Sequence, residues 1–408
     1  MSGKARAFII GNETGSKIGD WDKYLGGEIG PDGLVYAIPG SAKYVLRIDP
    51  STEIVEPVGR ALKGPFVKSS LPANQLKWLR GIRAPANGCI YGIPANANSV
   101  LKIDPAKCAP ALELGDASSD GLRLLGDGEA FLRGRWKWHG AALGGDGNVY
   151  AIPCNSPHVL KVDPRNDALS LLSISCPAAE ARSDAFCPRD PQKWYGGLLA
   201  NDGNIYGIPM NAPSVLRISP REQRAELLPI DARASPAAEV SPSDRWKWHG
   251  GVLGADGRCI YGMPSHADAV LKIVPATGRA YALGKLPKRD TDDHGKYKYG
   301  GAVVDPTTGI VYGIPSDADG VLKIVPATCP GRRRPPRRRR GDDLRPRQNS
   351  LRHRARRRRA MRTEQVAERL LQPAGRLHLL HPVRCRSRPQ DRPVRELGGG
   401  RSRRVSRH

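Results

Sequence analysis

The stretch Asn204-Ile-Tyr-Gly-Ile-Pro209 occurs six times, with small changes, along this chain of 408 residues. Its tyrosine stands at Tyr36, Tyr91, Tyr150, Tyr206, Tyr261 and Tyr312. The intervals between these tyrosines are 55, 59, 56, 55 and 51 residues. Such a spacing is typical of repeat architectures in which each copy forms one small unit. We therefore expect one domain over residues 1–328, with repeats at about 20–60, 75–115, 134–175, 191–229, 245–285 and 296–328.

Each repeat contains the signals of four short antiparallel strands. A Lys-aromatic step followed by small residues, as in 193–197, begins the first strand. An Asp-Gly or Asn-Gly dipeptide such as Asp202-Gly203 then predicts a tight hairpin turn before the tyrosine strand, which ends at a proline. Residues 100–103 alternate apolar and basic side chains, the period of a half-buried strand, and 279–284 give a weaker fourth strand.

The fold class that follows is all-β. A single four-stranded sheet cannot bury both of its faces, so neighbouring sheets must stack on one another. Stacking around an axis gives a β-propeller, and the glycines after the Lys-aromatic step suit the crowded strands near that axis. A linear β-solenoid is the alternative, but its coils are usually much shorter than these repeats. We predict a propeller of six intact four-stranded blades.

The repeat resembles a known group of propellers. The pattern Gly-x-Ile-Tyr-Gly-Ile-Pro, followed by Val-Leu-Lys-Ile-Asp-Pro, is similar to repeats of the NHL, virginiamycin B lyase and regucalcin-like group over about residues 20–330. This resemblance implies the propeller architecture. It also implies two possible chemistries, a hydrolase with a metal ion at the channel mouth or a lyase with a histidine base beside magnesium. The group includes plain binding modules too, so the resemblance does not fix an activity.

The last eighty or so residues differ from the rest. Residues 329–408 hold 27 arginines, no lysine and six acidic residues, and so carry +21 of the net charge of +25. A basic tail that binds nucleic acid is one interpretation. We favour another, that the tail is a seventh repeat read in the wrong frame and is disordered. Codons for 375–382 can read, one base later, Asp-Gly-Cys-Ile-Tyr-Cys-Ile-Pro, those for 387–393 Arg-Val-Leu-Lys-Ile-Asp, and those for 364–367 Ser-Lys-Trp-Arg.

Closure of the ring is a related expectation. Residues 5–11 read as a lone strand ahead of the first repeat, and such a strand can complete the last blade of a propeller. In a seven-bladed parent it would complete the seventh blade. In this chain it would have to pair with the sixth, and we expect lower stability than in an intact parent.

Two sets of polar side chains are expected at one rim of the channel. One set follows the Lys-aromatic step, and the other lies in the loop after each proline. The candidate ligand-binding residues are His139, His249, Tyr195, Asn96, Asn155, His158, Asn211, His266 and Asp317. The rim loops also carry Asn98, Asp268 and Asp319. Such a ring could bind a divalent cation or a polar ligand.

The recurrence of these residues favours structural duties, because an enzyme built on repeats must break their pattern at its site. Our leading hypothesis is therefore a non-catalytic scaffold that binds a protein or a small polar ligand and has no cofactor. The alternative is a metal-dependent hydrolase or lyase with a divalent cation at the channel mouth. Nucleic-acid binding is the third possibility, and only if the basic tail is genuine.

The chain offers little on its location. It has no apolar run long enough to span a membrane, and Met1–Phe8 lacks the apolar core of a signal peptide. No C-x-x-C pair indicates a zinc site. By default we expect a cytoplasmic protein without a membrane partner.

Overall fold

The computed structural model describes residues 23–62, 76–110, 120–175, 190–231, 240, 244–286 and 297–326. Each repeat forms its own antiparallel set of strands. The first and second units comprise β1 (Tyr24–Ile29), β2 (Val35–Pro39), β3 (Val45–Ile48), β4 (Val55–Val58), β5 (Trp78–Arg83), β6 (Ile90–Pro94), β7 (Val100–Ile103) and β8 (Leu122–Leu125). The third and fourth comprise β9 (Trp138–Leu143), β10 (Val149–Pro153), β11 (His158–Asp163), β12 (Ala168–Ser175), β13 (Trp194–Leu199), β14 (Ile205–Pro209), β15 (Val215–Ser219) and β16 (Arg224–Leu228). The fifth and sixth comprise β17 (Trp248–Leu253), β18 (Ile260–Pro264), β19 (Val270–Val274), β20 (Arg279–Leu283), β21 (Tyr299–Val304), β22 (Val311–Pro315) and β23 (Leu322–Ile324).

Helix is almost absent from the described ranges. They contain three short 3₁₀ turns, η2 (Pro105–Lys107), η4 (Ala130–Leu132) and η6 (Pro275–Thr277). Within each unit the strands pair in chain order. The fourth strands of the third and fourth units also pair in parallel, at Ile174↔Ala225 and Ser175↔Glu226. This pairing joins β9–β16 into one eight-stranded sheet.

The tyrosine that marks the repeat has a clear local role. The hydroxyl of Tyr206 donates a hydrogen bond of 2.8 Å to Asp202, the aspartate of the turn four residues earlier. The same bond, 2.7 Å long, joins Tyr150 to Asp146. Because a buried hydroxyl needs a partner, the turn aspartate and the buried tyrosine ring occur together in the sequence.

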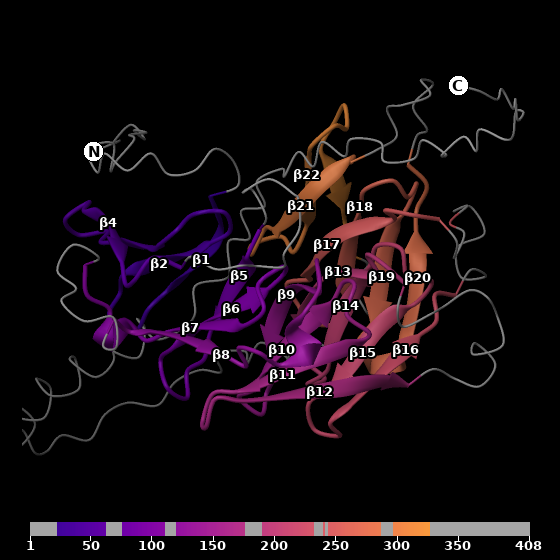
Figure 1. The fold of residues 1–408 in the computed structure, drawn as a ribbon. Helices are drawn as coiled ribbons and strands as arrows, with labels where there is room; N and C mark the ends of the chain where they lie inside the picture. The colour runs from indigo at the N-terminus through magenta and orange to yellow at the C-terminus, as the bar shows by residue number, and fades with distance from the viewer. Residues whose placement is uncertain are drawn as a thin grey trace, which may run out of the picture.

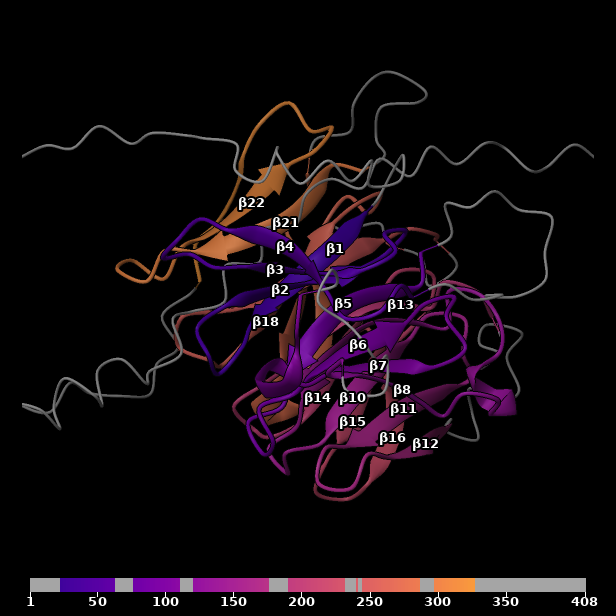
Figure 2. The same cartoon turned by 60° about the vertical axis from the view of Figure 1, so that its left-hand side comes forward.

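The first strands of successive units face one another around a common hub. Contacts run from β1 to β5, β5 to β9, β9 to β13, β13 to β17 and β17 to β21. Figure 1 shows this succession from indigo through magenta to orange, with β8, β12, β16 and β20 farther out, and Figure 2 shows the same sheets turned by 60°. The expected all-β, propeller-like arrangement is confirmed.

The core lies between the sheets, where each unit packs on the next. The isoleucine two residues after the repeat tyrosine packs against a glycine on the first strand of the following unit. A Cβ atom at Gly81 would lie 2.9 Å from Cδ1 of Ile38, and one at Gly197 would lie 2.6 Å from Cδ1 of Ile152. Both distances are too short for a side chain, so the glycine after the Lys-aromatic step allows the sheets to pack closely.

The sixth unit has an exposed outer face, the face on which a following unit packs in the earlier repeats. Ile314 is 46% exposed, whereas the corresponding residues of the earlier units are completely buried. Those residues are Ile38, Ile93, Ile152, Ile208 and Met263. Val321 is 61% exposed, whereas its counterparts are 0–3% exposed. Those counterparts are Val45, Val100, Val159, Val215 and Val270. Two apolar side chains that a following sheet covers in every earlier unit therefore have no following sheet over them among the described residues.

Some details of the expected organisation differ or lie elsewhere. The sixth unit has three strands within the described residues, not four. The fourth strand of the second unit, β8, lies beyond residue 115 because residues 104–121 separate it from β7. The expected closing strand at 5–11 and the tail at 329–408 lie outside the described residues. Among the residues that the structure describes, no helix is long and apolar enough to cross a membrane.

Candidate functional site

A pocket lies at the hub, at the end where the first strands begin and the second strands end. The residues that line it come from three positions of the repeat: the residue before the repeat lysine, the residue after the following aromatic, and the residue after the proline. The lining residues are Leu25, Leu76, Leu79, Trp136, His139, Cys154, Gln192, Tyr195, Met210, Trp246, His249, Ser265 and Tyr297. The pocket holds about 680 Å³ of empty space, including its open mouth.

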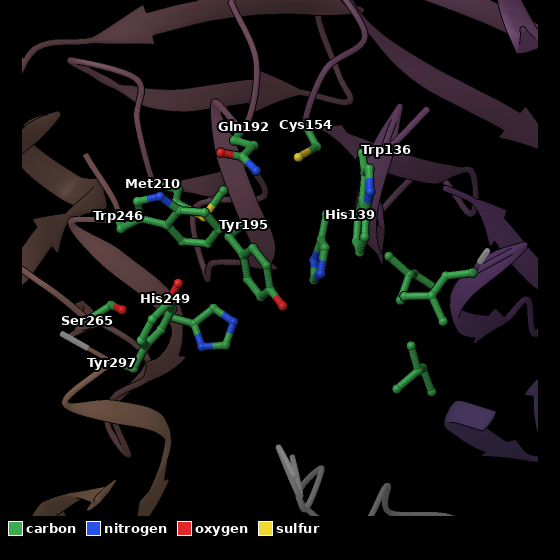
Figure 3. Close-up of a pocket in the computed structure, with 13 residues that line it drawn as sticks. Trp136, His139, Cys154, Gln192, Tyr195, Met210, Trp246, His249, Ser265 and Tyr297 are labelled. Atoms are coloured by element: carbon green, nitrogen blue, oxygen red, sulfur yellow. The ribbon is translucent and has the colours of Figure 1, made fainter. Parts of the chain in front are cut away.

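Three of the predicted residues meet in this pocket. The rings of His139 and Tyr195 have centroids 3.5 Å apart, and those of Tyr195 and His249 have centroids 3.9 Å apart. They come from the third, fourth and fifth units, and Figure 3 shows Tyr195 between the two imidazoles. The three rings form a continuous aromatic row, which we call the hub stack.

Both histidines of the hub stack hold protons weakly. Burial, followed by the positive charge of Arg80, lowers the pKa of His139 well below 6.5. The same two causes lower the pKa of His249 to about 4. Near neutral pH both imidazoles are therefore uncharged, and each offers one N–H donor and one nitrogen acceptor.

Sequence reasoning missed the side chains that precede each repeat lysine. Trp136, Gln192, Trp246 and Tyr297 line the pocket and all have positive φ, between 49° and 56°. A left-handed backbone is unfavourable for such residues, so other contacts must hold it in place. The constant position of these residues one step before the lysine was a usable signal.

The loop asparagines supply those contacts. The amide oxygen of Asn96 accepts a hydrogen bond of 2.8 Å from the backbone N–H of Trp136. The oxygen of Asn155 accepts one of 2.7 Å from the backbone N–H of Gln192. Asn211 makes the corresponding 2.8 Å bond with Trp246. Each asparagine therefore joins its own unit to the next, and none of the three lines the pocket.

The repeat lysine is a second link between units. Lys137 is 3% exposed, and its ammonium donates to the carbonyl oxygens of Ala95, Ala97 and Gly134 at 2.9–3.0 Å. Lys193 is completely buried and donates to the carbonyls of Cys154 and Asp190. Burial lowers the pKa of Lys137 to about 7, while the three carbonyls favour its charged form. The lysine thus holds the preceding loop against its own unit.

The other predicted residues lie around the pocket. His158 begins β11, and its carbonyl accepts a hydrogen bond from the Trp138 indole. The His266 ring contacts the rings of Trp246 and Tyr297, with centroids 6.2 and 4.9 Å away. Asp317 is exposed and lies 3.4 Å from the Ser316 hydroxyl. None of these three lines the pocket.

Sequence reasoning also missed Arg80, the residue that follows Leu79 of the pocket. The position of Arg80 is occupied by a glycine of positive φ at Gly26, Gly140, Gly196 and Gly250. Arg80 adopts the same left-handed backbone, with φ of 62°. Alignment of the repeats on their lysine would have revealed this exception. No group of three or more His, Cys, Asp or Glu side chains suited to a metal ion occurs within the described residues.

Comparison with known proteins found similar solved structures only. No family model and no curated protein matches the chain. Virginiamycin B lyase from Staphylococcus aureus is 10% identical over 75% of this chain and 82% of that chain, with a TM-score of 0.49. A streptogramin B lyase is 12% identical over 75% and 84%, with a TM-score of 0.47. Hydrazine synthase from Kuenenia stuttgartiensis is 14% identical over 75% and 77%, with a TM-score of 0.44. At these values the likeness says nothing about the activity of this chain.

Proposed function

We propose that this chain is a non-catalytic binding propeller whose hub pocket holds a small ligand with a flat apolar part. The observation that carries the proposal is the pocket lining. The hub stack of His139, Tyr195 and His249 provides ring faces, and the Trp136 and Trp246 indoles flank it (Figure 3). Aromatic faces bind planar groups by offset stacking and by burial of apolar area.

The polar groups of the pocket suit recognition. Gln192 and Ser265 lie on its wall, and the two neutral imidazoles can each donate or accept a hydrogen bond. A few fixed polar groups in an apolar pocket give a ligand its orientation. The asparagine links and buried lysines hold the lining residues rigidly, which reduces the entropic cost of binding. The ligand that fits best is therefore flat and mostly apolar, with a few polar atoms.

A neutral aromatic probe tests this proposal. We expect 2-naphthamide to bind the full chain in isothermal titration, and Tyr195→Ala to abolish that binding by removing the centre of the hub stack. Tyr281→Ala is the matched control, because Tyr281 lies on the outer strand β20. Absence of binding to the unmodified chain, or equal loss in both variants, would contradict a pocket that binds planar ligands.

The proposal includes an architecture of six blades that belong to a seven-bladed ring. The exposed Ile314 and Val321 support it, because their counterparts are covered by the next sheet. The sequence supports it further. Codons for residues 375–393 can be read one base later, without interruption, as Asp-Gly-Cys-Ile-Tyr-Cys-Ile-Pro-Ser-Asp-Ala-Asp-Arg-Val-Leu-Lys-Ile-Asp-Pro. This reading contains the tetrapeptide of 316–319 at the same place in the repeat.

Restoring the reading frame tests the architecture. A chain whose tail is translated one base later should unfold at a higher temperature, because a seventh blade would bury the outer face of the sixth. Sequencing of the genomic locus and its transcript is the companion measurement. A locus without this second open frame, or a restored chain with an unchanged unfolding temperature, would contradict a lost seventh blade.

A further inference from the structure

Arg80 breaks the symmetry of the hub. At this position the five other repeats have glycine, the residue that adopts positive φ at least cost, and four of those glycines have positive φ. Arg80 has a φ of 62°, a conformation that is unfavourable for a side chain of its size. Backbone strain of this kind persists only when the surroundings impose it, and it is concentrated at functional sites. The arginine therefore needs an explanation that the repeat itself does not supply.

The Arg80 side chain extends into the hub. A Cβ atom at Gly26 of β1 would lie 3.4 Å from its Cγ, and one at Gly140 of β9 would lie 3.9 Å from its Cδ. Its side chain therefore lies against the first strands on both sides of β5. Its charge also lowers the pKa of His139 and of His249, two members of the hub stack.

The charge of the Arg80 guanidinium is not balanced by any of the residues that the structure describes. Arg80 makes no hydrogen bond or ion pair with any residue in the described ranges. Arginine is rarely removed from water without a carboxylate, a phosphate or carbonyl oxygens to receive its N–H groups. The neighbouring imidazoles are neutral, so they neither compensate this charge nor add to it. The positive charge of Arg80 is thus left without an anionic partner among the described residues.

We propose that Arg80 binds the carboxylate of a planar organic acid whose ring system lies in the hub pocket. A guanidinium and a carboxylate form two parallel hydrogen bonds, which would fix the ligand's orientation. The aromatic row would hold the ring, and the neutral imidazole N–H groups would approach the carboxylate without opposing it. This inference rests on the proposed function, since it assigns the class of ligand that the same pocket takes.

A matched pair of probes separates the two proposals. 2-Naphthoate and 2-naphthamide have the same ring system and differ in charge. In isothermal titration with the full chain, we expect the acid to bind roughly tenfold more tightly than the amide, a difference that one charge-assisted hydrogen-bonded pair can supply. The preference for the acid should decrease as sodium chloride is added.

Substitution of Arg80 tests the assignment to this residue. Arg80→Gly restores the residue of the other repeats, so it should reduce binding of 2-naphthoate to the level of 2-naphthamide. The same variant should unfold at an equal or higher temperature, because glycine relieves the strain of positive φ. Arg80→Met keeps the bulk of the side chain and should lose the same preference for the acid. A purely structural arginine would instead lower the unfolding temperature when replaced by glycine.

The outcomes are distinct. Equal binding of acid and amide, or an acid preference that survives in both Arg80 variants, would overturn the role of Arg80 and leave the aromatic pocket as a binding site. A lower unfolding temperature in Arg80→Gly would also overturn it. If neither probe binds the unmodified chain, the proposed function itself fails.

Discussion

The amide oxygen of Asn211 accepts a hydrogen bond of 2.8 Å from the backbone N–H of Trp246, 35 residues later in the chain. This bond joins the loop of one unit to the start of the next, and it holds Trp246 at a φ of 55° with its indole on the pocket wall. A residue expected to face a ligand thus acts through the backbone of another residue, which lines the pocket.

Asn211→Ala should therefore weaken both the fold and the pocket. The substitution leaves a backbone N–H without its acceptor, and such a loss costs about 1–3 kcal/mol. We expect the free energy of unfolding in urea to decrease by that amount and binding of 2-naphthamide to weaken. The matched control is Asn204→Ala, because the Asn204 side chain donates to Asp202 in an exposed turn of its own unit. Equal effects of the two substitutions would show that the link between the units contributes nothing.

The hub stack predicts how stability varies with pH. The pKa of His249 is lowered to about 4, and that of His139 lies well below 6.5, so the unfolded chain binds more protons than the folded chain in the window between these values. Stability gained by keeping the histidines neutral is full above pH 6.5 and is lost as the pH falls toward 4. Urea unfolding at a series of pH values should show this decline. The variant His139→Gln/His249→Gln should show a flatter profile, and an identical slope would contradict the assignment.

The buried lysine is expected to contribute more than a surface lysine. Lys137→Met removes the donor shared by the carbonyls of Ala95, Ala97 and Gly134, and buried acceptors left without a donor cost about 1–3 kcal/mol. Lys161→Met is the control, because Lys161 lies on β11 and bonds to the side chain of Gln223 near the surface. Urea unfolding should separate the variants by at least 1 kcal/mol. Equal stabilities would mean that the lysine merely occupies space between the units.

Much of the fold could be predicted from the sequence because its signals are local. The Asp-Gly turns, the tyrosine strand and the closing proline lie within one repeat, and the period repeats them six times. The convergence of His139, Tyr195 and His249 was also predictable, since each follows the same Lys-aromatic step. The apolar character of the pocket could not be predicted in this way. It depends on Trp136 and Trp246, which line the hub from backbone positions with left-handed φ.

The roles of the polar loop residues could not be predicted for a related reason. Asn155 satisfies the backbone of Gln192, in a unit that begins some forty residues later, and no local pattern shows that pairing. The role of the buried lysine was hidden in the same way, because two of the three carbonyl partners of Lys137, those of Ala95 and Ala97, belong to the preceding unit. Arg80, by contrast, was visible as a departure from glycine in aligned repeats. The motif that the copies share does not reveal it, because the shared residue at that position is glycine.

The last unit provides a test of whether its outer face is covered. Val321 is 61% exposed, whereas its counterpart Val270 is 3% exposed and packs between two sheets. Val270→Lys should unfold the chain or lower its free energy of unfolding by several kcal/mol, because the new ammonium would be buried without a partner. Val321→Lys should change the free energy of unfolding by less than about 0.5 kcal/mol. We therefore expect Val270→Lys to be severely destabilised in urea and Val321→Lys to match the unmodified chain. In the chain with the restored frame, Val321→Lys should become costly, since a seventh blade would cover that residue. A large loss from Val321→Lys in the present chain would mean that residues outside the described ranges, or a second copy, already cover the sixth unit.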